Sequence, residues 1–235
     1  CNHENHLGNH PMNTNAANFL EAMRFRHACK EFDPSGQIPE EEFEAILEAG
    51  RLSPSSFGFE PWKFLVIQNM PLREKIRGLC WGGQGQLPTA SHVVVLLART
   101  PECMRPDSPY VQGEIMTETQ NLPEDMRELR TGRYRRFLDE DFCLTGNERA
   151  GFEWAARQCY IAMGNMLTMA AVMRIDSCPI EGFSKQGLED LLAGEGLLDS
   201  HEYGVACLMA FGYRKKKDLR PKTRRPAELV AQWVK

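Results

Sequence analysis

Residues 152–173 read FEWAARQCYIAMGNMLTMAAVM, and this stretch decides how the rest of the chain must be arranged. Apolar residues recur along it at helical spacing, and from Ile161 onward the pattern is apolar nearly all round. Such a helix must be buried on every side, in a large core or at a dimer interface. Its apolar part is shorter than the roughly 20 residues that a membrane span needs. The stretch therefore predicts a central buried helix.

On both sides of this helix the pattern predicts a mixture of helices and buried strands. The expected helices are 14–28, 39–52, 71–81 and 184–194, and the expected strands are 63–68, 91–98 and 203–213. The strand SHVVVLLA (91–98) is almost wholly apolar and β-branched, which is typical of burial on both faces. Because strands and helices do not alternate strictly, the pattern favours an α+β fold. The last stretch, PAELVAQWV (226–234), has one apolar face and no evident partner.

Two regions depart from this core pattern. Residues 101–150 are polar and proline-containing around one amphipathic piece, 123–142, which predicts an excursion or lid rather than part of the core. The first eleven residues, CNHENHLGNHP, predict a disordered tail or tag remnant. A metal site on its three histidines is the alternative. Without a repeat or linker, residues 12–235 are predicted to form a single domain.

Composition excludes several classes of protein. With 42% hydrophobic and 26% charged residues, the 235-residue chain has the composition of a globular protein with a real core. Its net charge of -4 argues against nucleic acid or an anionic membrane as the main partner. The eight cysteines form no CxxC pair and there is no signal peptide, so we expect reduced thiols in a cytoplasmic protein.

The common catalytic motifs are missing. The sequence has no GxGxxG, GxxxxGK[ST], HExxH or GxSxG motif. Outside the tail only His27, His92 and His201 occur, in three dissimilar contexts. These patterns give no support to zinc, Ser–His–Asp or Rossmann-type chemistry, and we expect no metal.

Two basic clusters point instead to an anionic ligand. Arg26-His27-Ala28-Cys29-Lys30 gathers three potential cations at a helix end, and Lys222-Thr223-Arg224 places two more on an extended segment after Pro221. Taken alone, each cluster is more often solvated surface charge. Together they suit a phosphate clamp, in which arginine forks onto two oxygens and lysine supplies a point charge.

Two tight segments suit a flat ligand. Ser53 to Trp62 (SPSSFGFEPW) begins where a helix stops, and its glycine and prolines suit a rigid loop that a planar ligand approaches closely. An ordinary helix-to-strand connector is the alternative. Cys178 to Phe183 (CPIEGF) is a similar segment after the buried helix, where backbone groups could face a heteroaromatic edge.

Taken in order, these segments resemble the nitroreductase family of FMN enzymes. RHACKEFD, SPSSFGFEPWKFLV, Gln84-Gly85-Gln86 with TASHVVV, the central helix with its PIEGF turn, and GYRKKKDLRPKTRRP are each similar to a motif of that family. The resemblance covers about residues 16–230 and keeps the order of the motifs. RHxCK together with QCYIA and DSC further resembles the bacterial branch that reduces nitroimidazole prodrugs.

The resemblance implies a nitroreductase-like fold, with a mainly antiparallel central sheet flanked by helices, in an interlocked homodimer. It implies an FMN phosphate and ribityl chain held by Arg26, Lys222 and Arg224, and Lys30 beside the pyrimidine edge, where a cation favours the reduced flavin. Gln86 would bond ribityl or pyrimidine atoms. The partner subunit would contribute Pro54, Ser55, Ser56 and Gly58. The isoalloxazine ring would lie along Pro179, Ile180, Glu181 and Gly182.

The remaining implied positions include three departures from the family's pattern. Ala28 stands beside His27 where the family usually has Ser, and Gly83 stands where it usually has Asn, with Gln84 as the compensating amide. The third departure, Phe57, is larger than the residue often found there. Lys30, Phe57, Tyr134 and Phe137 would line the substrate side.

The resemblance further implies ping-pong chemistry, in which NADH or NADPH reduces FMN and leaves before the acceptor binds. Nitroaromatics, quinones or similar electron-poor molecules are the expected acceptors, and no side chain is expected to act as a chemical catalyst. Flavin and enone reductases of the same family are alternatives. A flavin-binding redox carrier or sensor that uses Cys29, Cys159 and Cys178 is a rival from another class.

Overall fold

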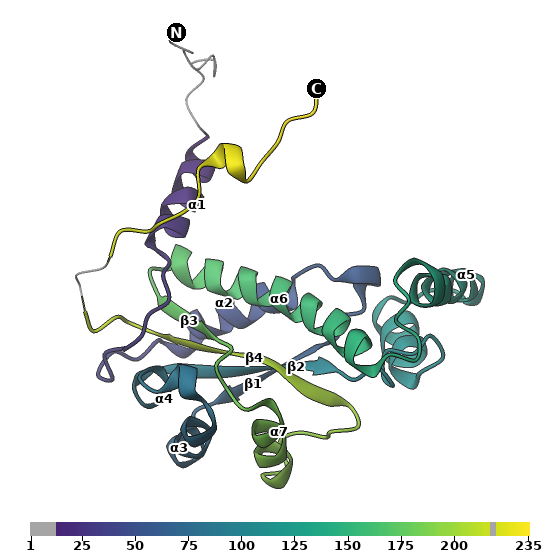
Figure 1. Cartoon of the computed structure of the whole chain (residues 1–235), viewed down its shortest axis with the longest axis horizontal. Helices are drawn as coiled ribbons and strands as arrows, with labels where there is room; N and C mark the ends of the chain where they lie inside the picture. The colour runs from purple at the N-terminus through teal and green to yellow at the C-terminus, as the bar shows by residue number, and fades with distance from the viewer. Residues whose placement is uncertain (1–12, 217–219) are drawn as a thin grey trace.

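A four-stranded antiparallel sheet runs through the middle of the computed structural model, which describes residues 13–216 and 220–235 (Figure 1). Its order is β1-β2-β4-β3, with bounds Trp62–Ile67 for β1, His92–Arg99 for β2, Asp176–Ile180 for β3 and Tyr203–Gly212 for β4. Every pair is antiparallel, which confirms the predicted α+β class. The predicted tail, and the metal site considered for its histidines, lie outside the described residues.

Strand β2 shows why the sheet divides the protein into two cores. It pairs with β1 and β4, and all eight of its residues are buried. Successive side chains of a strand point to opposite faces. One set therefore joins the larger core (Val94, Leu96, Ala98) and the other joins the smaller core (Val93, Val95, Leu97). The prediction of a strand buried on both faces is confirmed.

Helices cover both faces of the sheet. On one face lie α2 (Glu40–Arg51) and α6 (Glu148–Val172), and on the other lie α3 (Met70–Leu79), α4 (Gln86–Thr89) and α7 (Lys185–Gly194) (Figure 1). The long helix α6 is capped by Asn147, whose side chain accepts a hydrogen bond from the backbone N–H of Ala150 at 3.0 Å. Across the described ranges, no helix is long and apolar enough to cross a membrane.

The central helix α6 is not buried on every side, so that prediction is wrong for a single protomer. Its inner face, including Met166 and Ala170, is fully buried against the sheet and α2. A stripe at helical spacing stays open to solvent, however, and Ile161 (42%) and Val172 (52%) lie in it with Gly164 and Asn165. Among the described residues of a single chain, no element covers these exposed positions.

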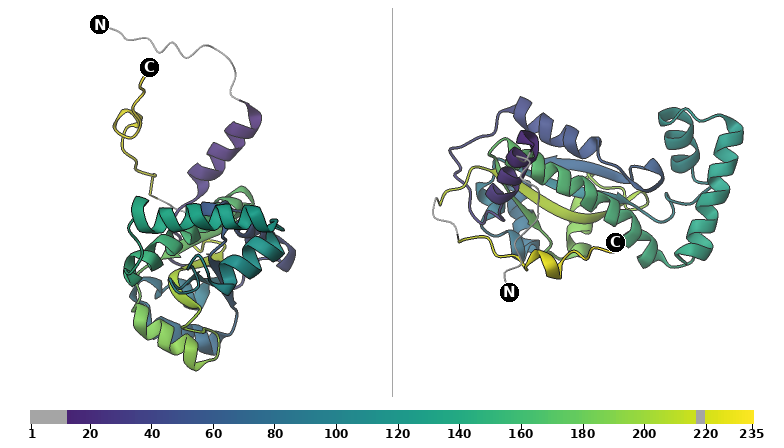
Figure 2. Two further views of the ribbon diagram at one scale, coloured as in Figure 1. Left: turned by 90° about the vertical axis from the view of Figure 1, so that its right-hand side faces the viewer. Right: turned by 90° about the horizontal axis from the view of Figure 1, so that it is seen from above.

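Helix α1 (Thr14–Phe25) and the C-terminal segment project away from the body of the protein (Figures 1 and 2). Ala22 is the one buried residue of α1, and Phe19 is 50% exposed. Every residue from 220 to 235 is exposed, including Trp233 at 85%. The stretch 226–234, for which the sequence shows no evident partner, is exposed along its whole length.

The segment predicted as an excursion is helical and forms the end of the molecule opposite α1 (Figure 1). Its elements are the π-helical η3 (Tyr110–Thr119), α5 (Glu124–Arg136) and the π-helical η4 (Phe137–Asp141). The expectation that it stays out of the core is wrong, because apolar side chains between its charged residues enter the larger core: Met104, Tyr110, Val111, Ile115, Met116 and Tyr134.

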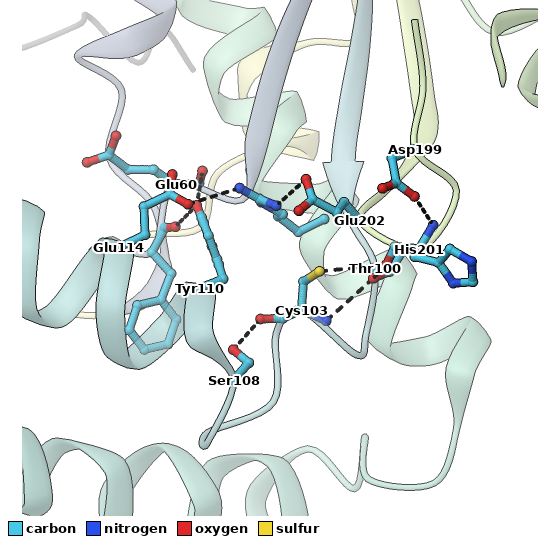
Figure 3. Close-up of polar contacts among 11 residues, drawn as sticks. Glu60, Thr100, Cys103, Ser108, Tyr110, Glu114, Asp199, His201 and Glu202 are labelled. Atoms are coloured by element: carbon cyan, nitrogen blue, oxygen red, sulfur yellow. Dashed lines mark hydrogen bonds and ion pairs between the residues drawn. The ribbon is translucent and has the colours of Figure 1, made fainter. Parts of the chain in front are cut away.

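One arginine ties this excursion to the sheet. Arg99, at the end of β2, is 6% exposed, and its guanidinium lies 3.9 Å from the ring centroid of Tyr110 and 4.3 Å from that of Tyr203. Its Nη2 lies 3.3 Å from a carboxylate oxygen of Glu114, and its Nη1 lies 3.1 Å from one of Glu202. Figure 3 shows Glu114, Tyr110 and Glu202 converging there. We call these five residues the Arg99 anchor.

Candidate functional site

The two basic clusters predicted from the sequence come together at the end of α1. Arg26 caps the helix, and the extended segment after residue 220 returns beside it. The ammonium group of Lys222 donates to the carbonyl oxygen of Met23 at 2.6 Å and to that of Arg26. Carbonyls at the end of a helix lack partners within the helix, so a lysine that binds them is held firmly in place.

Three cations crowd together here, and we call Arg26, Lys222 and Arg224 the cation cluster. Burial, and then the charges of Arg26 and Arg224, lower the pKa of Lys222. In the described part of the chain, no carboxylate lies within ion-pair distance of these three residues or of Lys30. Uncompensated positive charge of this kind is the donor set that an anion such as phosphate requires.

His27 has a structural contact instead. Its Nδ1 lies 3.4 Å from a carboxylate oxygen of Asp176, which is 4% exposed in β3. The other carboxylate oxygen accepts from the backbone N–H and the Nε of Arg214, both at 2.9 Å. Burial, and then the nearby Arg214, lower the pKa of His27. Asp176 thereby ties the segment after α1 to the segment after β4.

Ala28 and Lys30 line a hollow that also includes His27 and Arg214. Ala28 forms an isolated bridge with Ser177, which fixes the course of the chain after α1. The hollow has a volume of about 470 Å³, and ten residues line it: His27, Ala28, Cys29, Lys30, Glu31, Gly85, Pro88, Thr89, Arg214 and Lys216. A side chain at Gly85 would meet the carbonyl oxygen of Lys30 at 2.4 Å. Gly85 therefore allows these two backbones to pack closely.

Lys30 and Gln86 meet at one sulfur atom. The Nζ of Lys30 lies 3.8 Å from the Sγ of Cys178, and the Nε2 of Gln86 lies 3.4 Å from it. Gln86 is 2% exposed, at the start of α4. The structure thus brings both predicted residues together with β3.

The segment Pro179 to Gly182 is only partly the loop that the sequence predicted. Pro179 and Ile180 belong to β3, because they pair with Met209 and Leu208 of β4. Only Glu181 and Gly182 leave the sheet.

Beyond the strand, this segment packs against the turn after α3. The hydroxyl of Tyr160 donates to the Glu181 carboxylate. The backbone N–H of Gly82 donates to the carbonyl oxygen of Gly182 at 2.7 Å, and a Cβ on Gly182 would lie 2.9 Å from Gly82. The two glycines thus let two backbones touch beside the site.

Gly83 and Gln84 face away from this site. A Cβ on Gly83 would lie 2.9 Å from the sulfur of Cys80, so this position faces the smaller core. The amide nitrogen of Gln84 donates to the carbonyl oxygens of Arg77 and Cys80, at 2.7 and 2.8 Å. These bonds complete the C-terminal end of α3, so the amide expected to compensate at the site is already engaged.

The loop from Pro54 to Gly58 lies on the opposite side of α6. The backbone N–H of Ser56 donates to the side chain of Gln158 at 2.8 Å, whereas Tyr160 reaches Glu181. Side chains two positions apart on an α-helix point about 200° apart around the helix axis, and a helix with its side chains is about 10–12 Å wide. One copy of the chain therefore cannot bring Pro54, Ser55, Ser56 and Gly58 to a ligand that lies at Glu181.

The three predicted substrate aromatics form one cluster near this loop. The ring centroid of Phe57 lies 5.0 Å from that of Tyr134 and 5.4 Å from that of Phe137. Tyr134 is 0% exposed, and its hydroxyl donates to the carbonyl oxygen of Met104. The prediction that Tyr134 contacts a substrate is therefore wrong for this structure. Phe57 and Phe137 are half-buried and stay candidates.

Three contributors were missed in the sequence. Asp176 had a weak signal, an acidic residue between the apolar central helix and the tight segment that begins at Cys178. Tyr160 and the sulfur of Cys178 had none, because their roles depend on which segments the fold places beside them. Burial raises the pKa of Cys29 to about 11 and also raises that of Cys159, which argues against the thiolates that a sensor would need.

Comparisons with known sequences agree on one family. Residues 23–213 match the family model described as "Nitroreductase family". "Putative NAD(P)H nitroreductase YfkO" of Bacillus subtilis (strain 168) is 47% identical over 215 residues, covering 92% of this chain and 96% of that protein. A Staphylococcus aureus (strain USA300) protein, also named a putative NAD(P)H nitroreductase, is 44% identical over 219 residues, covering 92% and 95%.

Solved structures share the fold. "A putative nitroreductase in complex with FMN" from Exiguobacterium sibiricum 255-15 matches with a TM-score of 0.73 and 20% identity, covering 92% of this chain and 97% of that one. CLA-ER, an enone reductase of gut-bacterial fatty acid saturation metabolism, matches with a TM-score of 0.72 and 19% identity, covering 92% and 98%. The predicted arrangement of sheet and helices is confirmed.

Proposed function

The chain belongs to the nitroreductase family, and on that premise we propose that it is an FMN-dependent oxidoreductase. It moves two electrons from NADH or NADPH to a small, electron-poor acceptor such as a nitroaromatic or a quinone. The observation that carries the proposal is the cation cluster, in which Arg26, Lys222 and Arg224 gather without a carboxylate from the described residues. A phosphate monoester is the natural counterion for two arginines and a lysine.

The residues around the hollow fit the rest of the cofactor. When bound, FMN supplies the two-electron redox chemistry. Lys30 would place a positive charge beside the pyrimidine edge, where it favours the anionic reduced state. Gln86 offers a side-chain amide from the same side. The backbone at Glu181 and Gly182 would border the isoalloxazine ring, held by the Tyr160 and Gly82 contacts.

The function requires a second copy of the chain, and we include a homodimer in the proposal. The loop Pro54 to Gly58 is separated from Glu181 by α6 within one protomer. The open stripe on α6, the projecting α1 and the exposed C-terminal segment supply apolar surface for association. In a dimer, the partner's copy of that loop would complete the site.

The names of the sequence relatives support the acceptor class. Access of the acceptor to the site would depend on aromatic side chains of this chain. Phe57 and Phe137 are half-buried at the edge of the excursion, where they would border the substrate. The nitroimidazole-reducing branch remains part of this proposal. Reductant and acceptor would use the same open face in turn, which is ping-pong turnover.

A direct test is to purify the protein, release its yellow chromophore with heat and identify it. We expect FMN, bleaching by NADH or NADPH, and reoxidation by members of a panel of nitroaromatics, quinones, enones and free flavin. Parallel double-reciprocal lines would support ping-pong turnover. A colourless protein that cannot take up FMN contradicts the whole proposal, whereas a bound flavin that NADH and NADPH fail to bleach supports a carrier instead.

A further inference from the structure

The sulfur of Cys178 is the point at which three segments of the candidate site meet. It lies 3.8 Å from the ammonium nitrogen of Lys30 and 3.4 Å from the amide nitrogen of Gln86. Both of these groups are N–H donors, so the sulfur is their acceptor. Its own S–H donates to the carbonyl oxygen of Pro179 at 3.4 Å. Because Cys178 is 0% exposed, no water competes for the sulfur.

We propose that Cys178 is a positioning residue, which holds the Lys30 ammonium and the Gln86 amide in the orientation that FMN requires. This inference rests on the proposed function. A lysine is a point charge on a flexible four-carbon stem, so its position depends on what its end contacts. The Gln86 amide is buried and would have an unpaired donor without the sulfur.

Strand β3 makes the sulfur a fixed reference point. Cys178 pairs with Ala210 in the middle of the β3–β4 ladder, so its backbone cannot move without breaking the sheet. Lys30 and Gln86, by contrast, lie on a loop and at the first residue of a four-residue helix. The rigid element therefore supplies the acceptor, and the less rigid elements supply the donors.

A second buried thiol, outside the hollow, shows what is special about this one. Cys159 is 0% exposed in α6, and its sulfur lies 3.8 Å from the carbonyl oxygen of Pro61 and 3.7 Å from that of Leu97. In the described structure, Lys30 and Gln86 donate to the sulfur of Cys178 and not to this one. Cys159→Ala is therefore a matched control that removes a buried thiol without removing the junction.

The variant Cys178→Ala should change cofactor binding and cofactor potential together. Losing one acceptor for two donors should weaken FMN binding about three- to tenfold, the size expected for a net hydrogen bond. A less well placed Lys30 should favour reduced FMN less. We expect the midpoint potential to fall by about 15–30 mV, which corresponds to a three- to tenfold loss of that preference in a two-electron couple.

The experiment titrates apoprotein with FMN by fluorescence quenching and measures the potential of the bound cofactor by spectroelectrochemistry. Cys178→Ala is compared with wild type, with Cys159→Ala and with Cys178→Ser, whose hydroxyl keeps an acceptor and should restore most of both values. Cys178→Val fills the space in a β-strand without an acceptor, and it decides the question if the alanine variant does not fold. Lys30→Met is measured alone and with Cys178→Ala.

The expected pattern is a joint shift in Cys178→Ala and Cys178→Val, none in Cys159→Ala, and a shift in potential that is largely lost once Lys30 is already methionine. Wild-type values in Cys178→Ala or Cys178→Val overturn the inference, and so does a potential shift that simply adds to that of Lys30→Met. If wild-type apoprotein fails to bind FMN at all, the proposed function fails instead.

Discussion

Two regions of this protein use arginine in opposite ways. In the Arg99 anchor, the guanidinium is enclosed by Tyr110 and Tyr203. It also meets carboxylates of Glu114 and Glu202 (Figure 3). In the cation cluster, three positive side chains crowd at the end of α1, and the described chain supplies no carboxylate for them.

The difference separates charge that holds the fold from charge that awaits a ligand. A buried cation whose partners come from the same chain is already compensated within the fold, so removing it leaves those partners unpaired. Cations that crowd together, as where Arg26 and Arg224 lower the pKa of Lys222, gain only when something negative arrives. Removing charge should therefore cost stability in the first region and ligand affinity in the second.

The largest effect should come from emptying the cation cluster. In Lys222→Ala/Arg224→Ala, two charge-assisted phosphate contacts disappear, each worth about 1.5–3 kcal/mol. We expect FMN affinity to fall by at least about 100-fold, measured by fluorescence titration of apoprotein. The free energy of unfolding of the apoprotein should change by less than about 0.5 kcal/mol, as for an exposed surface site. A large loss of stability with unchanged affinity would reverse the assignment.

The next effect should come from the Arg99 anchor. Arg99→Met keeps much of the side-chain volume but leaves Tyr110 and Tyr203 without the cation between them. We expect the free energy of unfolding to fall by about 2–3 kcal/mol, below the usual cost of breaking a fully buried pair because Glu114 and Glu202 are half exposed. Urea titration of apoprotein measures this loss. FMN affinity of the folded fraction should stay within about twofold, and a greater loss would link the two regions.

Acid should act on the fold through a third buried group. The ring of His92 stacks on that of Phe43 with centroids 3.8 Å apart. Burial, and then the charge of Arg73, lower the pKa of His92 to about 4. Since the unfolded pKa is near 6.5, the stabilisation is complete above that value and is lost as pH falls toward 4. From pH 7 to pH 5, the free energy of unfolding should fall by about 1–2 kcal/mol from this group.

His92→Gln serves as the comparison for the pH experiment, because it cannot take up the proton. Urea titrations at pH 7, 6 and 5 should show a smaller slope for this variant. The pKa of His27 is also lowered, so some slope should remain. Equal slopes for wild type and variant would mean that His92 does not titrate as the structure indicates.

The smallest effect should come from one carboxylate of the anchor. Glu114 has a side-chain exposure of 58%, and Glu202 still faces Arg99 when Glu114 is neutral. Glu114→Gln should lower the free energy of unfolding by about 0.5 kcal/mol, the range of a surface ion pair. A loss above about 2 kcal/mol would show that the anchor depends on this one pair rather than on the aromatic enclosure.

The fold was predictable where periodicity reports burial. Strand β2 and helix α2 follow directly from an apolar run and from an amphipathic repeat. The prediction for helix α6 was wrong on one side of a single chain. An apolar pattern indicates that a surface is buried, but not which chain buries it. The excursion was predicted to lie outside the core for a related reason. Its buried residues, such as Tyr110 and Met116, are surrounded in the sequence by polar and charged residues.

The candidate site was predictable as residue types and order, but not as contacts. Lys222 meeting the end of α1 joins positions about 200 residues apart, which no local pattern encodes. Gln84 and Tyr134 were plausible by position, yet one caps α3 and the other fills the core. Cys178 was noted as the start of a tight segment and as a thiol of the alternative sensor, but its contacts with Lys30 and Gln86 became visible only in the fold.

Helix α1 and the C-terminal segment leave apolar surface exposed on a single copy of the chain. The activity of the proposed homodimer should therefore depend on protein concentration. In the proposed homodimer, each site takes one loop from the second copy, so cofactor retention and pairing are linked by mass action. Dilution should then loosen FMN, and saturating FMN should hold the pair together at lower protein concentration. A cell that makes little of this chain would hold less active enzyme than the number of chains suggests.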